Sequence, residues 1–140
     1  NQVHYSLLHR EPEFNGVKLL CDDLNVTLIA YSPLEQGILT GKYTPDNPPP
    51  GLRGRQYNAQ YLTKVKPLLE QMREIGEAHG GKTPAQVALN WLICKGTMPI
   101  PGAKNARHAR GNAGAMGWRM HDEEVAALDE SSLRVRRSID

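Results

Sequence analysis

The stretch VTLIAYS, residues 26–32, limits the folds open to this chain more than any other segment. It is a nearly continuous apolar run, bounded by Asn25 on one side and Pro33 on the other. A strand that is apolar on both faces is typical of a parallel sheet with helices on both sides, whereas strands with one solvated face alternate. We therefore expect residues 26–32 to form a buried parallel strand.

The segments on either side of this run complete a strand–helix–strand unit. Residues 2–8, QVHYSLL, alternate loosely and predict a strand. A helix is expected to begin near Pro12 and to end at Asn25, because the apolar residues between them share one helical face. These residues are Val17, Leu20, Cys21 and Leu24. A strand, a helix and a second strand in this order form a βαβ unit.

Four more helices and one more strand are expected downstream. Residues 62–79 predict an amphipathic helix with Pro67 near its first turn. Thr83, Pro84 and Gln86 form a capping box that opens the next helix, which points Trp91 inward. A short strand at 97–101 and helices at 105–115 and 122–132 follow. Because the strands alternate with helices, the fold class is α/β with parallel strands.

Residues 33–60 lack any helical or strand periodicity and include a Pro-rich centre, PDNPPPGLRG. Loops of this length are uncommon inside compact domains and are usually functional or disordered. We predict a lid or binding loop here, with a plain surface loop as the alternative.

Composition excludes several classes of function. The chain has 140 residues, the size of one domain, and its net charge of +2 gives no basis for binding nucleic acid or a membrane surface. No apolar run is long enough to span a membrane, and no His or Cys spacing indicates a metal site. Cys21 and Cys94 are expected to be free thiols in a reducing compartment, and residues 133–137 a solvated tail.

Residues 98–112, MPIPGAKNARHARGN, combine the end of a strand, a Gly turn and the start of a helix. This order directs free backbone N–H groups and a helix dipole to one place, where Lys104 adds a full charge. The pattern predicts a phosphate site. The alternative is an ordinary turn in which Lys104 and Arg107 are solvated.

Several motifs together resemble the aldo-keto reductase family: QVHYSLL, IAYSPLEQGILTGKY, KTPAQVALNWL and PIPGAKNA. The resemblance runs from Asn1 to about Ser132 and is nearest to plant and cyanobacterial-type members. It implies the C-terminal portion of a TIM barrel, with residues 1–140 as a single partial domain. It also implies NADP(H) as the cofactor and aldehydes or ketones as substrates, reduced to alcohols by hydride transfer.

The resemblance implies roles for individual residues along the cofactor. Gln2 would bond the nicotinamide carboxamide and Tyr31 would stack on the nicotinamide ring. The pyrophosphate would be lined by a first group of residues: Ser32, Pro33, Leu34, Gly37, Lys42 and Arg53. The adenosine half would be held by a second group, Gly102, Lys104, His108 and Asn112, with Lys104 on the 2′-phosphate. His108 and Gly111 replace the glutamine and the acidic residue that are usual in the family.

No catalytic residue is assigned, because the family's catalytic Asp, Tyr, Lys and His match nothing in this chain. Two other functions therefore stay open: a non-catalytic NADP-binding or scaffold protein, and an inactive half-barrel. A barrel needs about 250 residues, so we expect a partner or further chain to supply the missing strands. The expected location is soluble, in a plastid or the cytoplasm.

Overall fold

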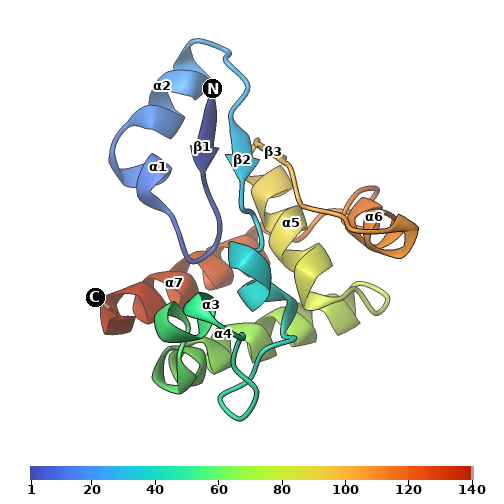
Figure 1. Ribbon diagram of the computed structural model, residues 1–140. Helices are drawn as coiled ribbons and strands as arrows, with labels where there is room; N and C mark the ends of the chain where they lie inside the picture. Colours follow the sequence, from blue (N-terminus) through green and yellow to red (C-terminus); the bar gives the residue numbers. More distant parts are fainter. Residues whose placement is uncertain (140) are drawn as a thin grey trace.

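A computed structural model describes residues 1–139, and its centre is a small parallel sheet (Figure 1). The strands are β1 (Gln2–His4), β2 (Ile29–Tyr31) and β3 (Met98–Pro99), in the order β1-β2-β3. Gln2 pairs with Ile29, which pairs with Met98. The three expected strands are confirmed in place, type and direction, although each is shorter than predicted. The expectation that residues 26–32 are buried holds for Ala30 but not for Val26 and Tyr31, which are exposed.

The helical segment between β1 and β2 differs from its prediction. It contains two short helices, α1 (Glu11–Phe14) and α2 (Val17–Asp23), instead of one. Gly16 separates them with a φ of 84°, a left-handed conformation that glycine adopts without strain. The expected apolar face is buried at Cys21, but Leu20 and Leu24 are 58% and 63% exposed. Periodicity located the apolar residues correctly but could not reveal whether another element covers them.

Residues 33–60 are not the structureless loop that their composition predicts. They contain a kinked 3₁₀ segment, η1 (Glu35–Thr40), and a short helix, α3 (Leu52–Gln56). Tyr43 and Tyr57 are buried in the hydrophobic core and hold both sides of the Pro-rich centre. Buried aromatic side chains therefore order a segment whose Pro and Gly content hides its structure.

The long helix α4 (Ala59–Ala78) begins earlier than the position of its proline predicts. The Asn58 side chain caps it by accepting a hydrogen bond from the Tyr61 backbone N–H at 2.9 Å. Pro67 therefore lies inside the helix, and the prediction that it occupies the first turn is wrong. Leu62 and Val65, which precede Pro67, are buried, so packing extends the helix past a residue that disfavours its interior.

The remaining helices are α5 (Pro84–Cys94), α6 (Ala106–Ala113) and α7 (Asp122–Ile139). The predicted capping box of α5 is present, with Thr83 and Gln86 each bonding the other's backbone N–H. The prediction that residues 133–137 form a solvated tail is wrong, because they continue α7. Val135 is buried in the core, and Arg136 bonds Glu11 of α1 at 2.9 Å.

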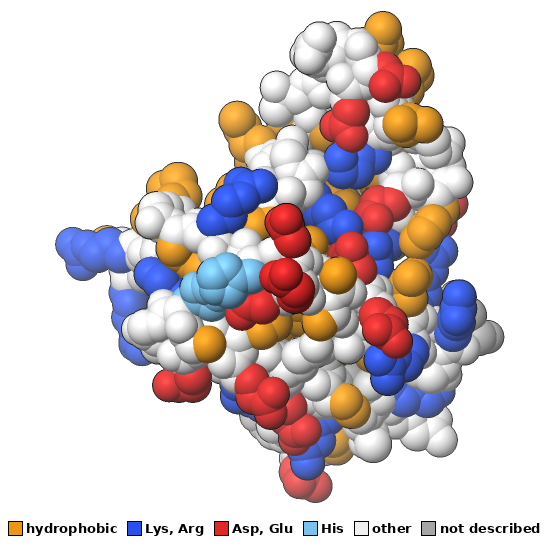
Figure 2. Space-filling view, turned by 180° about the vertical axis from the view of Figure 1, so that it is seen from behind, with side chains coloured by type: hydrophobic (Ala, Val, Ile, Leu, Met, Phe, Trp, Pro, Cys, Tyr) orange, Lys and Arg blue, Asp and Glu red, His pale blue; other side chains and the backbone are white. Residues whose placement is uncertain are grey.

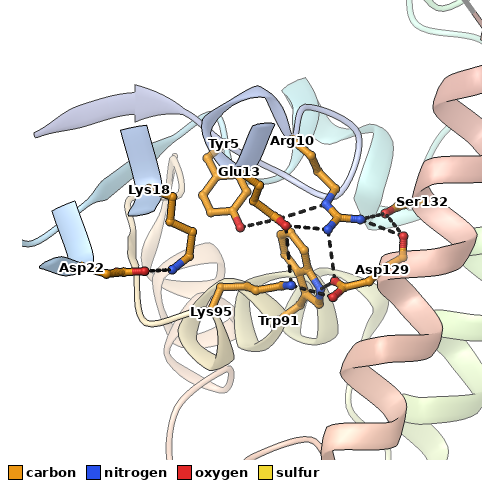
Figure 3. A network of polar contacts seen from close by, with 9 residues as sticks. All are labelled: Tyr5, Arg10, Glu13, Lys18, Asp22, Trp91, Lys95, Asp129 and Ser132. Carbon is orange, nitrogen blue, oxygen red and sulfur yellow. Dashed lines mark hydrogen bonds and ion pairs between the residues drawn. The ribbon is translucent and has the colours of Figure 1, made fainter. Parts of the chain in front are cut away.

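A partly buried network of polar groups, centred on the buried Arg10, joins α1, α5 and α7 (Figure 3). The Arg10 guanidinium donates to Glu13 at 2.6 Å and to the Asp129 backbone oxygen at 2.7 Å. Tyr5 also donates to Glu13, and Trp91 donates its indole N–H to the Asp129 carboxylate at 2.8 Å. Burial alone would raise the pKa of Glu13, but the hydrogen bonds from Arg10 and Tyr5 lower it. The carboxylate is therefore held ionised beside the buried guanidinium.

Two sequence expectations concern the chain as a whole. Both cysteines are free, and Cys21 is buried. Among residues 1–139, none of the helices combines the length and the apolar character that a membrane span requires.

Candidate functional site

The backbone that leaves β2 is unusually strained. Ser32, Glu35 and Gln36 have φ values of 50°, 49° and 53°, in the left-handed region that side chains disfavour. Gly37 follows with a φ of 95°, which suits glycine. Such conformations cost on the order of 1–3 kcal/mol each and concentrate at functional sites. The strained turn lies where ligands bind in parallel α/β folds, beyond the carboxyl end of a strand.

A buried carboxylate, Glu35, holds this turn in place. Its side chain accepts hydrogen bonds from the Ser6 hydroxyl at 2.7 Å and the Tyr57 hydroxyl at 3.1 Å, and it lies 3.0 Å from His4 Nε2. These partners come from the end of β1, from the segment that follows it, and from the end of the Pro-rich segment. Glu35 therefore ties two neighbouring strand ends and the ordered loop together, and it is 6% exposed.

Tyr31, at the end of β2, presents an aromatic ring that is 41% exposed. The His4 ring stacks against it with centroids 5.3 Å apart, and the His9 ring stacks on His4 at 3.9 Å. Burial and the neighbouring His4 lower the pKa of His9, which keeps the stacked ring neutral near pH 7. Gln2 and Tyr31 line the same hollow of about 320 Å³ at the edge of β1.

Residues 33–60 supply two cations, of which Arg53 contacts the strained turn. Arg53 donates to the Gln36 carbonyl at 3.4 Å, which brings its guanidinium to the turn. The Lys42 ammonium lies over the Tyr43 ring, 5.1 Å from its centroid. Both side chains belong to exposed residues, so their charges can meet an anion from solvent.

The turn between β3 and α6 forms the second part of the site. The Asn105 side chain caps α6 by accepting from the His108 N–H at 2.9 Å, and the Lys104 N–H donates to His108 Nδ1 at 3.4 Å. Asn112 reaches back to the Gly102 carbonyl at 3.2 Å. The turn thus folds onto its own helix. Within residues 1–139, the Lys104 side chain has no bonding partner and is exposed.

The fold brings the predicted site residues into two groups at adjacent strand ends. Ser32, Pro33, Leu34 and Gly37 follow β2, and Arg53 joins them through Gln36. The second group surrounds the start of α6, after β3, which hydrogen-bonds to β2. Gln2 lies earlier along the strands, level with Ile29 rather than with Tyr31.

Sequence reasoning missed Glu35 and His4. Both lie inside motifs already singled out, QVHYSLL and IAYSPLEQGILTGKY, but nothing in their spacing shows that they meet. An acidic residue within an apolar, Gly-containing turn is the one signal that could have drawn attention to Glu35, since buried carboxylates need partners.

Comparison with known proteins identifies the class of protein to which this fold belongs. The model of the aldo/keto reductase family matches residues 1–133. The chain belongs to this family of oxidoreductases. Its fold is that of part of a TIM barrel, which confirms the resemblance and the fold class that the motifs predicted.

Particular relatives cover almost all of the chain. It is 44% identical to the chloroplastic pyridoxal reductase of Arabidopsis thaliana over 138 residues, 99% of this chain and 37% of that protein. The glycerol dehydrogenase of Gluconobacter oxydans superimposes with a TM-score of 0.85 at 25% identity, over 95% of this chain and 42% of the other. The crystal structure of an aldo-keto reductase in complex with NADPH superimposes with a TM-score of 0.65 at 26% identity. The match covers 94% of this chain and 34% of the other.

These matches also show the extent of the chain relative to its family. It spans about two fifths of the length of the proteins that it matches. The activities of those relatives are therefore activities of longer polypeptides.

Proposed function

We propose that this chain is the cofactor-binding part of an NADP(H)-dependent oxidoreductase that reduces aldehydes or ketones to alcohols by hydride transfer. The observation that carries the proposal is the juxtaposition of a strained turn and an unpaired cation at adjacent parallel strand ends. A dinucleotide is long enough to bridge two such ends, and its phosphates suit backbone N–H groups and cations.

The nicotinamide belongs at Tyr31 in this proposal. One face of the Tyr31 ring is covered by His4, and the ring is 41% exposed, so an aromatic ligand has one face on which to stack. Gln2 lines the same hollow and offers an amide to a carboxamide.

The remaining candidate residues would bind the phosphates and the adenosine of the cofactor. The turn from Ser32 to Gly37 would receive the pyrophosphate, with charge from Lys42 and Arg53. Gly102, His108 and Asn112 would frame the adenosine, with Lys104 on the 2′-phosphate. The residues fit the cofactor because an exposed, unpaired ammonium precedes a capped helix of eight residues.

The reaction needs more than these residues. We assign no catalytic residue within the chain, and the carbonyl substrate would meet groups from the rest of the barrel. Two features of residues 1–139 favour further strands as partners: β1 and β3 each have one edge without a neighbour in the sheet, and Leu19, Leu20 and Leu24 are exposed. The chloroplastic location of the pyridoxal reductase supports a plastid for this protein.

Lys104 supplies the sharpest test of the cofactor. In the full-length protein, Lys104→Ala is expected to weaken NADPH binding about tenfold to a hundredfold, since charge-assisted hydrogen bonds contribute roughly 1.5–3 kcal/mol. NADH binding should hardly change, because NADH lacks the 2′-phosphate. Titration of both cofactors by fluorescence measures the difference.

Arg107 is the control for this experiment, because it lies on the first turn of α6 and is also exposed. Arg107→Ala alone and the double variant show whether the two cations share the contact. Equal losses of NADPH and NADH affinity in Lys104→Ala would refute the 2′-phosphate role. Loss of neither would leave Lys104 a solvated side chain.

Tyr31 tests the nicotinamide end. Tyr31→Ala is expected to weaken NADPH binding by about 1–3 kcal/mol, the scale measured for base–aromatic stacking. Tyr31→Phe should retain most of the affinity, since the ring remains. Dissociation constants and melting temperatures measured together separate lost stacking from lost fold, and wild-type affinity in Tyr31→Ala would contradict the placement.

A further inference from the structure

Three side chains outside the proposed cofactor site meet where α4 ends and α7 begins. His79 is the C-terminal cap residue of α4, His121 directly precedes α7, and Glu124 lies in the first turn of α7. The potential ligand atoms of the three all lie within 4.8 Å of one another. His79 and Glu124 are 45 residues apart in sequence, so no local motif shows this group.

We propose that His79, His121 and Glu124 bind a divalent transition-metal ion such as Zn²⁺, with water as the remaining ligand. Two imidazoles and one carboxylate form a donor set that suits Zn²⁺ and leaves a fourth position open in a tetrahedral site. The donor set does not suit Mg²⁺ or Ca²⁺, which prefer oxygen ligands.

In the present structure the three residues are joined by hydrogen bonds, which a metal ion can replace with coordination bonds. His79 Nε2 lies 2.7 Å from Glu124 Oε1, and the same oxygen accepts from the His121 backbone N–H at 2.8 Å. Zn²⁺ binds nitrogen and oxygen at about 2.0–2.2 Å, which separates tetrahedral ligand atoms by ~3.3 Å. A metal ion would therefore take the place of the proton between His79 and Glu124 and widen that contact slightly.

His79 and Glu124 are fixed by their surroundings, whereas the His121 side chain can change its orientation. The side chains of His79 and Glu124 are only 14% and 19% exposed, and the Trp118 ring lies 4.9 Å from the His79 ring. His121 is an exposed residue whose ring lies 5.3 Å from that of His79, so rotation of its side chain can bring a nitrogen to the ion.

The surrounding charge also favours a cation. Asp122 and Glu123 share the first turn of α7 with Glu124, and their carboxylates outweigh the partial positive charge of the α7 N-terminus, while the C-terminus of α4 adds partial negative charge. The nearby Lys82 ammonium is directed to the Trp118 ring, 5.7 Å from its centroid. Figure 2, which views the face opposite to that of Figure 1, shows histidine side chains beside carboxylates at the surface. An ion can therefore reach such groups from solvent.

The consequence would be a clamp between the two long helices. α4 and α7 pack against each other along their length, and a shared ion would join the end of one to the start of the other (Figure 1). Because the ion binds only when both helices are in place, it would stabilise the folded chain.

Cobalt and zinc titrations of the full-length protein test the proposal. One equivalent of Co²⁺ should bind and give the visible absorption of a four-coordinate ion, and Zn²⁺ should displace it while Mg²⁺ should not. Zn²⁺ should also raise the melting temperature. Absence of both the absorption band and the thermal shift would overturn the proposal.

The decisive variant is His121→Ala, because its exposed ring can be removed without opening the core. It should weaken Zn²⁺ binding roughly tenfold or more, and the thermal shift should disappear. His108→Ala, which removes another exposed imidazole, should leave Zn²⁺ binding as in the wild type. Equal Zn²⁺ affinity in His121→Ala and the wild type would overturn the site, whether or not Zn²⁺ binds elsewhere.

Glu124→Gln provides a second, conservative variant. It keeps the size of the side chain and removes the negative charge, and it should weaken Zn²⁺ binding by a similar factor. Circular dichroism of each variant confirms that the helices are intact, so that a changed affinity reports the ligands. Wild-type affinity in Glu124→Gln would also contradict the proposal.

Discussion

Arg10→Ala is expected to lower the free energy of unfolding by about 3–5 kcal/mol, the usual cost of removing one partner from a buried ion pair. Arg10 is 4% exposed and bonds Glu13, the Asp129 backbone oxygen and the Ser132 hydroxyl (Figure 3). Its loss leaves the half-buried Glu13 carboxylate without its guanidinium partner, although the Tyr5 hydroxyl still donates to it and Lys95 lies 3.7 Å away. Urea unfolding followed by circular dichroism measures the change.

An exposed arginine on α7 provides the matched control. Arg134 pairs with Glu130 at 2.9 Å, and both side chains are about 70% exposed. Because exposed ion pairs contribute roughly 0–1 kcal/mol, Arg134→Ala should change stability little. A loss in Arg10→Ala no larger than that in Arg134→Ala would show that the network does not stabilise the fold.

Glu35→Ala is expected to lower the free energy of unfolding by about 2–4 kcal/mol. The change removes the buried carboxylate that the Ser6 hydroxyl, the Tyr57 hydroxyl and the His4 imidazole contact. The effect should extend to the candidate site. Without Glu35, the strained turn at residues 32–37 and Tyr57 lose their common anchor. Limited proteolysis between residues 33 and 57 should become faster, and NADPH binding in the full-length protein should weaken.

Two further variants make the Glu35 result specific. Glu35→Gln keeps one acceptor oxygen and should be destabilised less than Glu35→Ala. Glu70→Ala removes an exposed carboxylate from α4 whose contact with Lys66 is 4.0 Å long, and it should leave both readouts unchanged. Unchanged proteolysis in Glu35→Ala would mean that the turn is held by its backbone alone.

The elements that the sequence predicted well are those with strong local signals. The capping box at Thr83 and the apolar run before Pro33 act within a few residues, so they fix a helix start and a strand almost independently of the rest of the molecule. The motifs around Tyr31 and Lys104 were likewise sufficient to indicate the family.

The elements that were predicted wrongly depend on distant contacts. Pro67 lies inside a helix because the residues before it pack into the core, and residues 133–137 stay helical because Val135 does the same. The Pro-rich segment is ordered by Tyr43 and Tyr57, which are buried in the hydrophobic core, and Tyr57 also donates to Glu35, 22 residues away.

For this protein, the sequence alone determined the order of the three strands and of helices α4 to α7, the family, and the residues that are candidates for cofactor binding. Those properties follow from periodicity, capping and motifs, which act over short distances along the chain. Only the tertiary structure decided that Glu35 joins three segments, that Arg10 is buried among α1, α5 and α7, and that His79 meets Glu124. Each of these contacts depends on helices and strand ends that packing brings together, and the spacing of residues along the sequence does not show which of them will meet.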